Sequence, residues 1–195
     1  DEFEYRQGVW NTGLGRTRRE DRPERPELTG PRTVLLALDP ITNTEAWRVV
    51  SEGAVPWVPM GPLDSGVEMK LLRVGKEDDV CTFMNRFQPG FQAPKHLHLG
   101  EVHAYTVEGC WHYLEYDWVS RAGDYVFEPP DTCHTLHVPE DNTGPTVVFF
   151  SVAKGMDLYT PEGEVFMTQD NRGLEALYRG GIEFLGLDWP DAILP

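Results

Sequence analysis

The sequence predicts an all-β single domain that closes, or nearly closes, into an antiparallel barrel with an extended N-terminal arm and a short C-terminal helix. From Val67 onward, short apolar segments recur roughly every 8 to 15 residues between Gly, Pro and Asp, which is typical of barrels and sandwiches. The segment Thr146 to Val152 is dominated by Val and Phe, as in a central strand buried on both faces. With 195 residues, 40% of them hydrophobic, the chain can build one core, and nothing indicates a second domain.

The first 32 residues are predicted to form a polar arm, and residues 33–195 the single domain. The arm is rich in Arg and is interrupted by Pro23, Pro26, Gly30 and Pro31, so it can form little core of its own. Arms of this kind often lie on a partner subunit, and we therefore expect a homodimer or a higher homo-oligomer. A disordered tail is the alternative.

The elements expected after the arm follow from hydrophobic patterning and turn residues. We expect a strand over Val34 to Leu38, a short helix around Thr44 to Val50, and then a loop marked by prolines 56, 59 and 62. The main strands are expected over Val67 to Val74, Val80 to Phe87, Val102 to Val107, Trp111 to Val119, Tyr125 to Phe127, His134 to Val138, and Thr146 to Val152. The C-terminal helix is expected over Asn171 to Arg179 with Asp170 as its cap, followed by a packed tail, Ile182 to Pro195.

Charge and cysteine content narrow the classes of partner. The formal net charge is −15, and because the arm holds seven Arg and seven Asp or Glu, the whole excess lies after residue 32. An acidic domain repels nucleic acid and anionic lipid, so neither is an expected partner. The three cysteines have no Cys-x-x-Cys spacing, which argues against a disulfide framework or a zinc finger. This cysteine pattern fits a reducing cytoplasm, which is the compartment we expect; no apolar stretch reaches about 20 residues, and the acidic start is unlike a signal peptide.

Histidine is the residue type that points to chemistry. All six histidines fall between positions 96 and 137. His96 and His98 stand two apart, so on a strand both imidazoles project to the same face. A Pro-Pro-Asp turn after Phe127 can bring His134 back towards that pair. Three neutral imidazoles suit iron, zinc, copper, nickel or manganese, whereas calcium and magnesium prefer oxygen ligands.

Two stretches, residues 90–109 and 123–138, resemble the paired motifs of the cupin superfamily, whose fold is a double-stranded β-helix or jelly-roll barrel. The residues that match are Gly90, His96, His98 and Gly109 in the first stretch, and Gly123, Pro129 and His134 in the second. The chain departs from the pattern at position 102, where Val102 replaces the usual glutamate ligand. Glu101 and His103 flank that position, but strand parity points them to the other face unless a bulge re-aims them.

Residues 90–151 are similar to a narrower group, the 2,4'-dihydroxyacetophenone dioxygenases, and to acetylacetone-cleaving cupins. The resemblance implies non-haem Fe(II) on His96, His98 and His134, with a nearby carboxylate that carries over to Glu115. It also implies that O2 cleaves a carbon–carbon bond of an aryl hydroxyketone to give an aryl carboxylate and formate. Zn, Mn, Ni or Cu remain open, as do a β-diketone or flavonol-type dioxygenase, a decarboxylase, or a non-catalytic metal- or ligand-binding cupin.

Further roles are assigned by position alone. His103 or Glu115 is expected to take the substrate proton, and Tyr105, Trp111 and Trp118 to flank an aromatic ring. The alternative for the three ligand histidines is buried hydrogen bonding, and for Glu115 a hydrogen bond to tyrosines or an ion pair with arginine. The aromatic run can be core packing. Surface or supporting roles are the alternative for His103, His112 and His137, and Cys110 and Cys133 are expected to be small buried hydrophobes.

Overall fold

The computed structural model describes residues 4–6, 9–11 and 48–195. Two short strands, β1 (Glu4–Arg6) and β2 (Val9–Asn11), pair antiparallel near the N-terminus. The rest of the predicted arm, the strand expected at 34–38 and most of the helix expected at 44–50 lie outside the described residues. The part of that helix that is described, residues 48–50, is not helical.

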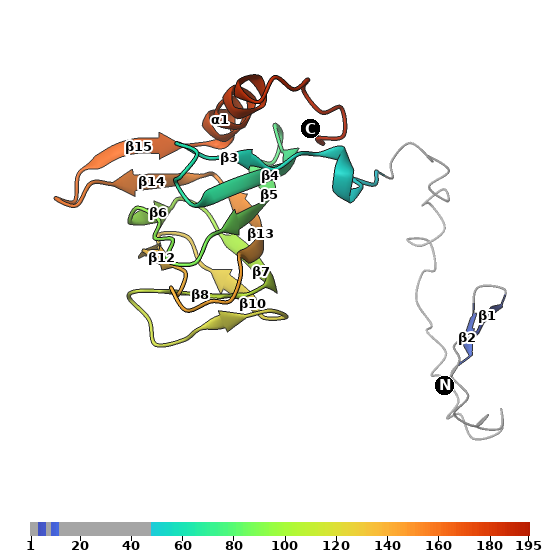
Figure 1. Cartoon of the computed structure of the whole chain (residues 1–195), viewed down its shortest axis with the longest axis horizontal. Coiled ribbons are helices and arrows are strands. Elements are labelled where there is room, and N and C mark those ends of the chain that lie inside the picture. The colour runs from blue at the N-terminus through green and yellow to red at the C-terminus, as the bar shows by residue number, and fades with distance from the viewer. Residues whose placement is uncertain (1–3, 7–8, 12–47) are drawn as a thin grey trace, which may run out of the picture. The chain divides into compact units, whose positions relative to one another are not determined.

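From residue 48 onward the chain is mostly β-structure, as predicted (Figure 1). A 3-10 turn, Glu52–Ala54, precedes the strands β3 (Val58–Pro59), β4 (Val67–Val74), β5 (Val80–Phe87), β6 (His96–His98), β7 (Val102–Glu108), β8 (Cys110–Tyr113), β9 (Ser120–Arg121), β10 (Tyr125–Glu128), β11 (Cys133–His134), β12 (Leu136–His137), β13 (Thr146–Ala153), β14 (Met156–Tyr159) and β15 (Val165–Gln169), and the helix α1 (Asn171–Phe184) follows them.

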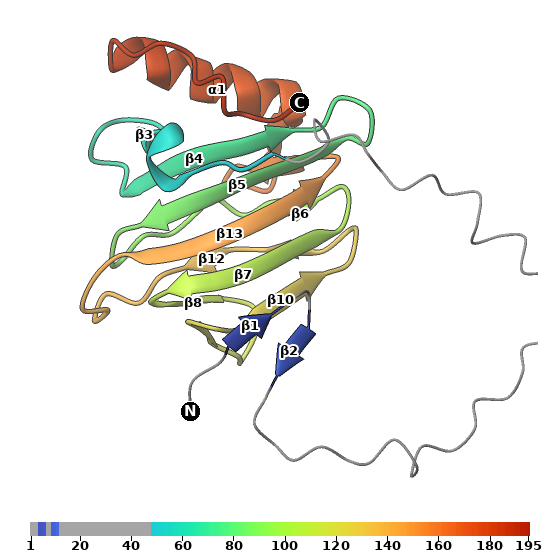
Figure 2. The same cartoon turned by 90° about the vertical axis from the view of Figure 1, so that its right-hand side faces the viewer.

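Three sheets make up this part of the chain, and all of their paired strands are antiparallel. The first has the order β10-β7-β13-β5-β4-β3, the second β11-β6-β14-β15, and the third β12-β8-β9. The predicted central strand, β13, pairs with β5 on one side and β7 on the other. Figure 2 shows these strands side by side, with α1 lying next to β3 and β4 at one edge of the sheet.

One face of the large sheet packs into the hydrophobic core, and alternate side chains of each strand point to it. Along β5, Cys81, Phe83, Asn85 and Phe87 are buried, whereas the residues between them are more exposed. Successive side chains of a strand point to opposite faces, so this alternation identifies the inward face of β5. Asn85 is thus a polar residue on a face that is otherwise apolar.

Helix α1 begins at the cap that the sequence predicts. The Asp170 carboxylate accepts a hydrogen bond from the Gly173 amide at 2.7 Å. The helix buries Leu174, Tyr178 and Ile182, which are four residues apart and so lie on one face. Because Ile182 continues this buried face, the helix extends beyond its predicted end, to Phe184. The tail packs as predicted, with Trp189, Ala192 and Ile193 against the core.

Other elements differ from the sequence-based prediction. The strand expected over 111–119 ends at Tyr113, because the chain turns there, with the Tyr116 amide donating to the Tyr113 carbonyl. The segment expected as one strand from His134 divides into β11 and β12, which belong to different sheets. Strand β15 was not predicted. Its side chains from Val165 to Thr168 are exposed on both faces, so the polar–apolar alternation that marks a strand is missing.

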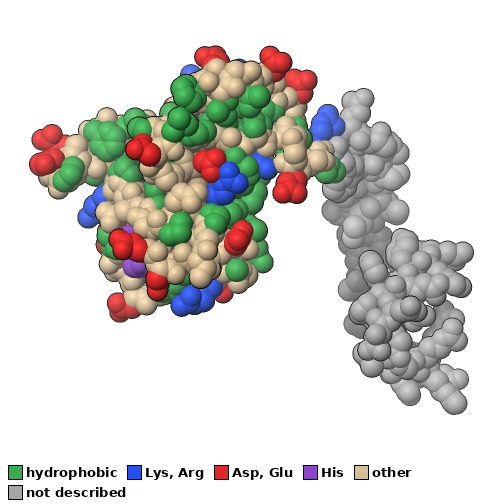
Figure 3. All heavy atoms as spheres, viewed as in Figure 1, with side chains coloured by type: hydrophobic (Ala, Val, Ile, Leu, Met, Phe, Trp, Pro, Cys, Tyr) green, Lys and Arg blue, Asp and Glu red, His purple; other side chains and the backbone are tan. Residues whose placement is uncertain are grey.

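The described surface carries many acidic side chains. Figure 3 shows Asp and Glu distributed over several parts of the visible face, with fewer Lys and Arg. Of the helices that the structure describes, none combines the length and hydropathy needed to cross a membrane.

Replacing Leu71 by alanine is expected to destabilise the domain by about 2–5 kcal/mol, because the side chain is fully buried and the truncation leaves a cavity. Urea unfolding followed by circular dichroism measures this free energy. The matched control is Leu63→Ala, since Leu63 is 72% exposed and its truncation should change stability by less than about 0.5 kcal/mol. Equal effects of the two substitutions would contradict this assignment of the core.

Candidate metal centre

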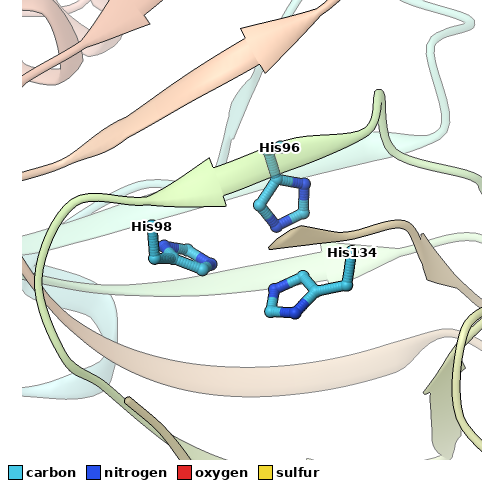
Figure 4. A group of neighbouring side chains, drawn as sticks. All are labelled: His96, His98 and His134. Carbon is cyan, nitrogen blue, oxygen red and sulfur yellow. The ribbon is translucent and has the colours of Figure 1, made fainter. Parts of the chain in front are cut away.

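Three buried histidines meet inside the domain. His96 and His98 project from β6 to one face, and β11 pairs with β6 so that His134 lies opposite His96. Their ligand nitrogens all lie within 4.8 Å of one another. Figure 4 shows the three rings facing a common space. Of the described residues, this is the one group of three or more His, Cys, Asp or Glu side chains with metal-site geometry.

The protonation of these rings suits metal binding. Burial lowers the pKa of His98 to about 3, although the negative charge of Glu128 opposes this shift. Burial likewise lowers the pKa of His96. Its Nδ1 lies 2.9 Å from the Pro94 carbonyl, so Nδ1–H donates there and Nε2 remains for a ligand bond. Neutral imidazole is the form that binds metal ions, and His96 and His98 are neutral at pH 7.

A buried carboxylate that the sequence analysis did not assign stands beside the triad. Glu128 Oε2 lies 3.2 Å from His98 Nε2 and 3.3 Å from His134 Nε2. Its other oxygen, Oε1, accepts a hydrogen bond from the Tyr113 hydroxyl at 2.5 Å. Burial by itself would raise the pKa of Glu128, but the nearby imidazoles of His134 and His98 and the hydrogen bond from Tyr113 outweigh it and lower the pKa. The carboxylate is therefore ionised at neutral pH.

Strand register explains how Glu128 reaches this position. β10 pairs with β7 so that Glu128 lies directly opposite Val102, the position at which cupin motifs usually carry glutamate. Directly opposed residues of an antiparallel pair share one face, with Cβ atoms about 4.5–5.5 Å apart. Val102 is fully buried and His103 is exposed, which confirms the predicted parity. The carboxylate of Glu128, on the neighbouring strand, thus lies in the region where a glutamate at position 102 would place its own.

Unpartnered polar atoms show that a cation fits here. Of the five buried side-chain N or O atoms that lack a hydrogen-bond partner among the described residues, four belong to His98, His134 and Glu128. Buried polar groups are normally satisfied, so a cluster of exceptions needs an explanation. The ion-pair contacts found for Glu128 are with these imidazoles. Two ligands of one ion are about 3.0–3.4 Å apart when each bond is about 2.1 Å, which matches the separations around Glu128 Oε2.

Glu115, the predicted carboxylate ligand, lies just after β8 and is bound to Thr135. Its two oxygens accept hydrogen bonds from the Thr135 amide at 2.8 Å and the Thr135 hydroxyl at 2.9 Å. Burial raises the pKa of Glu115, but these two hydrogen bonds outweigh it and lower the pKa below its usual range. Both carboxylate oxygens are occupied, and Glu115 thus anchors the residue that follows His134.

The structure does not bring His103 or Tyr105 to the triad. Both side chains lie on the exposed face of β7, opposite to the buried Val102 and Ala104. His103 Nδ1 is hydrogen-bonded to the Tyr125 hydroxyl at 2.6 Å. The roles predicted for His103 as proton acceptor and for Tyr105 in substrate binding have no geometric support, because strand parity points both away from the centre.

Of the two tryptophans predicted to bind substrate, one lies in the hydrophobic core and the other lines a cavity beside the histidine triad. Trp111 is fully buried in the core and donates from Nε1 to the Thr106 hydroxyl at 2.9 Å. Trp118 is partly exposed and, with Tyr116, Glu128 and His134, lines a cavity of about 300 Å³. The structure thus places Trp118, but not Trp111, in a cavity that borders the triad.

A larger and more apolar cavity, of about 430 Å³, is also lined by residues of the triad. His96, His98 and Tyr113 line it together with Phe, Leu, Met and Val side chains. A volume of this size is within the usual range of small-molecule sites, which combine apolar walls with a few polar groups. Tyr113 lines both cavities and stacks on His134 with ring centroids 3.6 Å apart.

The remaining histidines and cysteines lie outside the triad. His112 Nε2 and His137 Nδ1 are hydrogen-bonded to each other at 3.1 Å across β8 and β12. Cys110 is partly buried and donates from Sγ to Asn142, and Cys133 is partly buried next to His134. Burial raises the pKa of Cys81 to about 12, so this thiol is unreactive at neutral pH.

The barrel and its three inward histidines define a cupin with a site that can hold a metal ion. Residues 45–158 match the family model of the ChrR cupin-like domain, and the chain belongs to this family. The comparison with curated proteins gave no match.

Solved structures agree with this fold. A cupin-like protein of unknown function from Ralstonia eutropha JMP134 is 29% identical, with a TM-score of 0.67 over 80% of this chain and 98% of that one. An RmlC-like cupin from the same strain is 24% identical, with a TM-score of 0.68 over 75% and 94%. An acetylacetone dioxygenase from Acinetobacter johnsonii is 15% identical, with a TM-score of 0.60 over 69% and 91%. At these last two identities the likeness concerns the fold alone.

Proposed function

We propose that this protein is a non-haem Fe(II)-dependent dioxygenase that uses O2 to cleave a carbon–carbon bond of an aryl hydroxyketone. The observation that carries the proposal is the cluster of unpartnered buried atoms on His98, His134 and Glu128, next to which His96 and His98 line an apolar cavity. A buried, negatively charged carboxylate is stabilised by a nearby cation. The sequence resemblance to hydroxyketone-cleaving cupins supplies the substrate class.

The proposed ligands are His96, His98, His134 and Glu128. Glu128 offsets one positive charge of a divalent ion, and Tyr113 holds its carboxylate in place through the hydrogen bond to Oε1. When bound, the ion would supply Lewis acidity and positions for the two oxygens of a chelating hydroxyketone.

The reaction balances without a further reductant. The bond between the carbonyl carbon and the hydroxymethyl carbon breaks, and one oxygen atom of O2 goes to each carbon. An aryl carboxylic acid and formic acid together contain all the atoms of the ketone and of O2. The walls of the larger cavity are mostly apolar and so disfavour water beside the substrate, which would slow protonation of a reactive substrate anion.

Oxygen consumption tests this function. The protein is loaded with ferrous ion under anaerobic conditions and mixed with a panel of 2-hydroxyacetophenones and β-diketones in air-saturated buffer. We expect O2 uptake in a one-to-one ratio with a carboxylate product, which chromatography detects. Zinc-loaded protein is the matched control and should consume no O2, because zinc has no accessible redox change.

Two other outcomes would identify the alternatives. Uptake with β-diketones but not with hydroxyketones would contradict the proposed substrate class and favour a β-diketone dioxygenase. No uptake by a protein that holds iron tightly would overturn the dioxygenase and favour another cupin enzyme or a binding role.

A further inference from the structure

The larger cavity contains one deeply placed amide. Asn85 lies on the inward face of β5 between Phe83 and Phe87, and only 8% of it is exposed. All three side chains line the cavity that also contains His96 and His98. A buried amide in an apolar wall is costly unless its polar atoms find partners.

Asn85 has only part of its hydrogen-bonding capacity satisfied within the protein. Its Nδ2 donates to the Glu68 carbonyl at 3.3 Å, which holds the amide in one orientation. One N–H and the carbonyl oxygen Oδ1 remain, since no hydrogen bond to Oδ1 is found among the described residues and Oδ1 is not one of the five fully enclosed unpartnered atoms. The remaining N–H and Oδ1 are thus available to a molecule in the cavity, and a hydroxyl matches both because it donates and accepts.

The other polar groups of the cavity wall are less suited to this task. His96 and His98 belong to the triad, and the Tyr113 hydroxyl donates to Glu128. Gln169 lies on the edge strand β15 and is only partly buried. The described wall contains no Lys, Arg, Asp or Glu, so an ionised substituent would be buried without a counter-charge.

We propose that Asn85 is a specificity-determining residue that hydrogen-bonds a neutral hydroxyl on the ring of an aryl ketone in this cavity. The inference rests on the proposed function for its substrate class. Asn85 therefore distinguishes aryl hydroxyketones with a ring hydroxyl from those without one. Its amide is held by the backbone of β4, so the recognising atoms are oriented before the ligand binds.

Binding to zinc-loaded protein tests this inference without turnover. Isothermal titration calorimetry compares 2,4'-dihydroxyacetophenone with 2-hydroxyacetophenone, which differ only in the ring hydroxyl. In the wild type we expect the hydroxyl to strengthen binding about tenfold, the effect of one buried hydrogen bond. In Asn85→Leu, which keeps the number and branching of the side-chain heavy atoms but removes the amide, we expect the ratio of the two affinities to fall to about one.

Gln169→Leu is the matched control, since it removes the other amide of the wall and should keep the tenfold ratio. Thermal melting confirms that both variants are folded. The inference is overturned if the wild type binds neither ketone or shows no preference, if Asn85→Leu keeps the preference, or if Gln169→Leu loses it instead. A preference that disappears in Asn85→Leu, in a protein whose ferrous form consumes no O2, would support the recognition and reject the dioxygenase.

Discussion

The His134→Ala variant is expected to lose tight metal binding and all metal-dependent activity. His134 is almost completely buried, and its Nε2 lies 3.3 Å from Glu128 Oε2, so alanine removes one of three imidazoles and leaves a gap. Loss of a group that merely orients a ligand costs about 10- to 100-fold in metal affinity, and loss of a ligand should cost more. Metal content after dialysis, measured by mass spectrometry, gives the result directly.

Thermal melting gives an independent measurement. A metal ion that binds only the folded state stabilises it by about 2.7 kcal/mol at 100 times its Kd, so the wild type should melt at a higher temperature when metal is added. We expect no such increase for His134→Ala. His137→Ala is the matched control, because His137 lies in the same segment but is hydrogen-bonded to His112 instead of facing the triad. Wild-type metal content in His134→Ala would refute the proposed centre.

The Glu128→Gln variant is expected to weaken metal affinity by about 100-fold or more while the protein stays folded. Glutamine keeps the size of the side chain and can still accept the hydrogen bond from Tyr113. It removes the negative charge that would offset the ion, and an amide oxygen is a weaker ligand than a carboxylate. Competition with a chelator of known affinity measures the change.

Glu115→Gln is the control that separates the two candidate carboxylates. Its oxygens are bonded to Thr135, so we expect nearly unchanged metal affinity and a loss of stability of about 1 kcal/mol from the altered hydrogen bonds. The opposite pattern, with affinity lost in Glu115→Gln and kept in Glu128→Gln, would restore the ligand that the sequence resemblance implies. Loss of affinity in both variants would mean that both carboxylates support the centre.

The three histidines could be predicted because their positions depend on local geometry. A separation of two residues places His96 and His98 on one face of any strand, whatever that strand pairs with. The turn that precedes His134 is also visible in the chain as a Pro-Pro-Asp sequence. The structure brings these three residues together, as the sequence predicts.

The strands and the helix were predictable where their patterns are regular. The alternation along β5 and the cap at Asp170 are both present in the structure. Strand β15 escaped prediction because its side chains are exposed on both faces and so show no alternation. The end of β8 at Tyr113 was also missed, and with it the reason that Glu115 does not continue the face of Trp111 and Tyr113.

Periodicity, caps and turns act over a few neighbouring residues, so the barrel, the C-terminal helix and the histidine triad could be predicted from the sequence. The carboxylate that stands beside the histidines could be identified in the folded protein alone, because its position depends on how distant strands pair. Val102 shows that β7 lacks the usual glutamate ligand. The register between β7 and β10 places Glu128 directly opposite Val102. Side-chain parity within one strand predicts the face to which each residue points. It does not predict which residue lies opposite on the paired strand, because pairing joins residues far apart in the chain. The placement of Asn85 in the cavity wall likewise depends on strand pairing, in this case between β4 and β5.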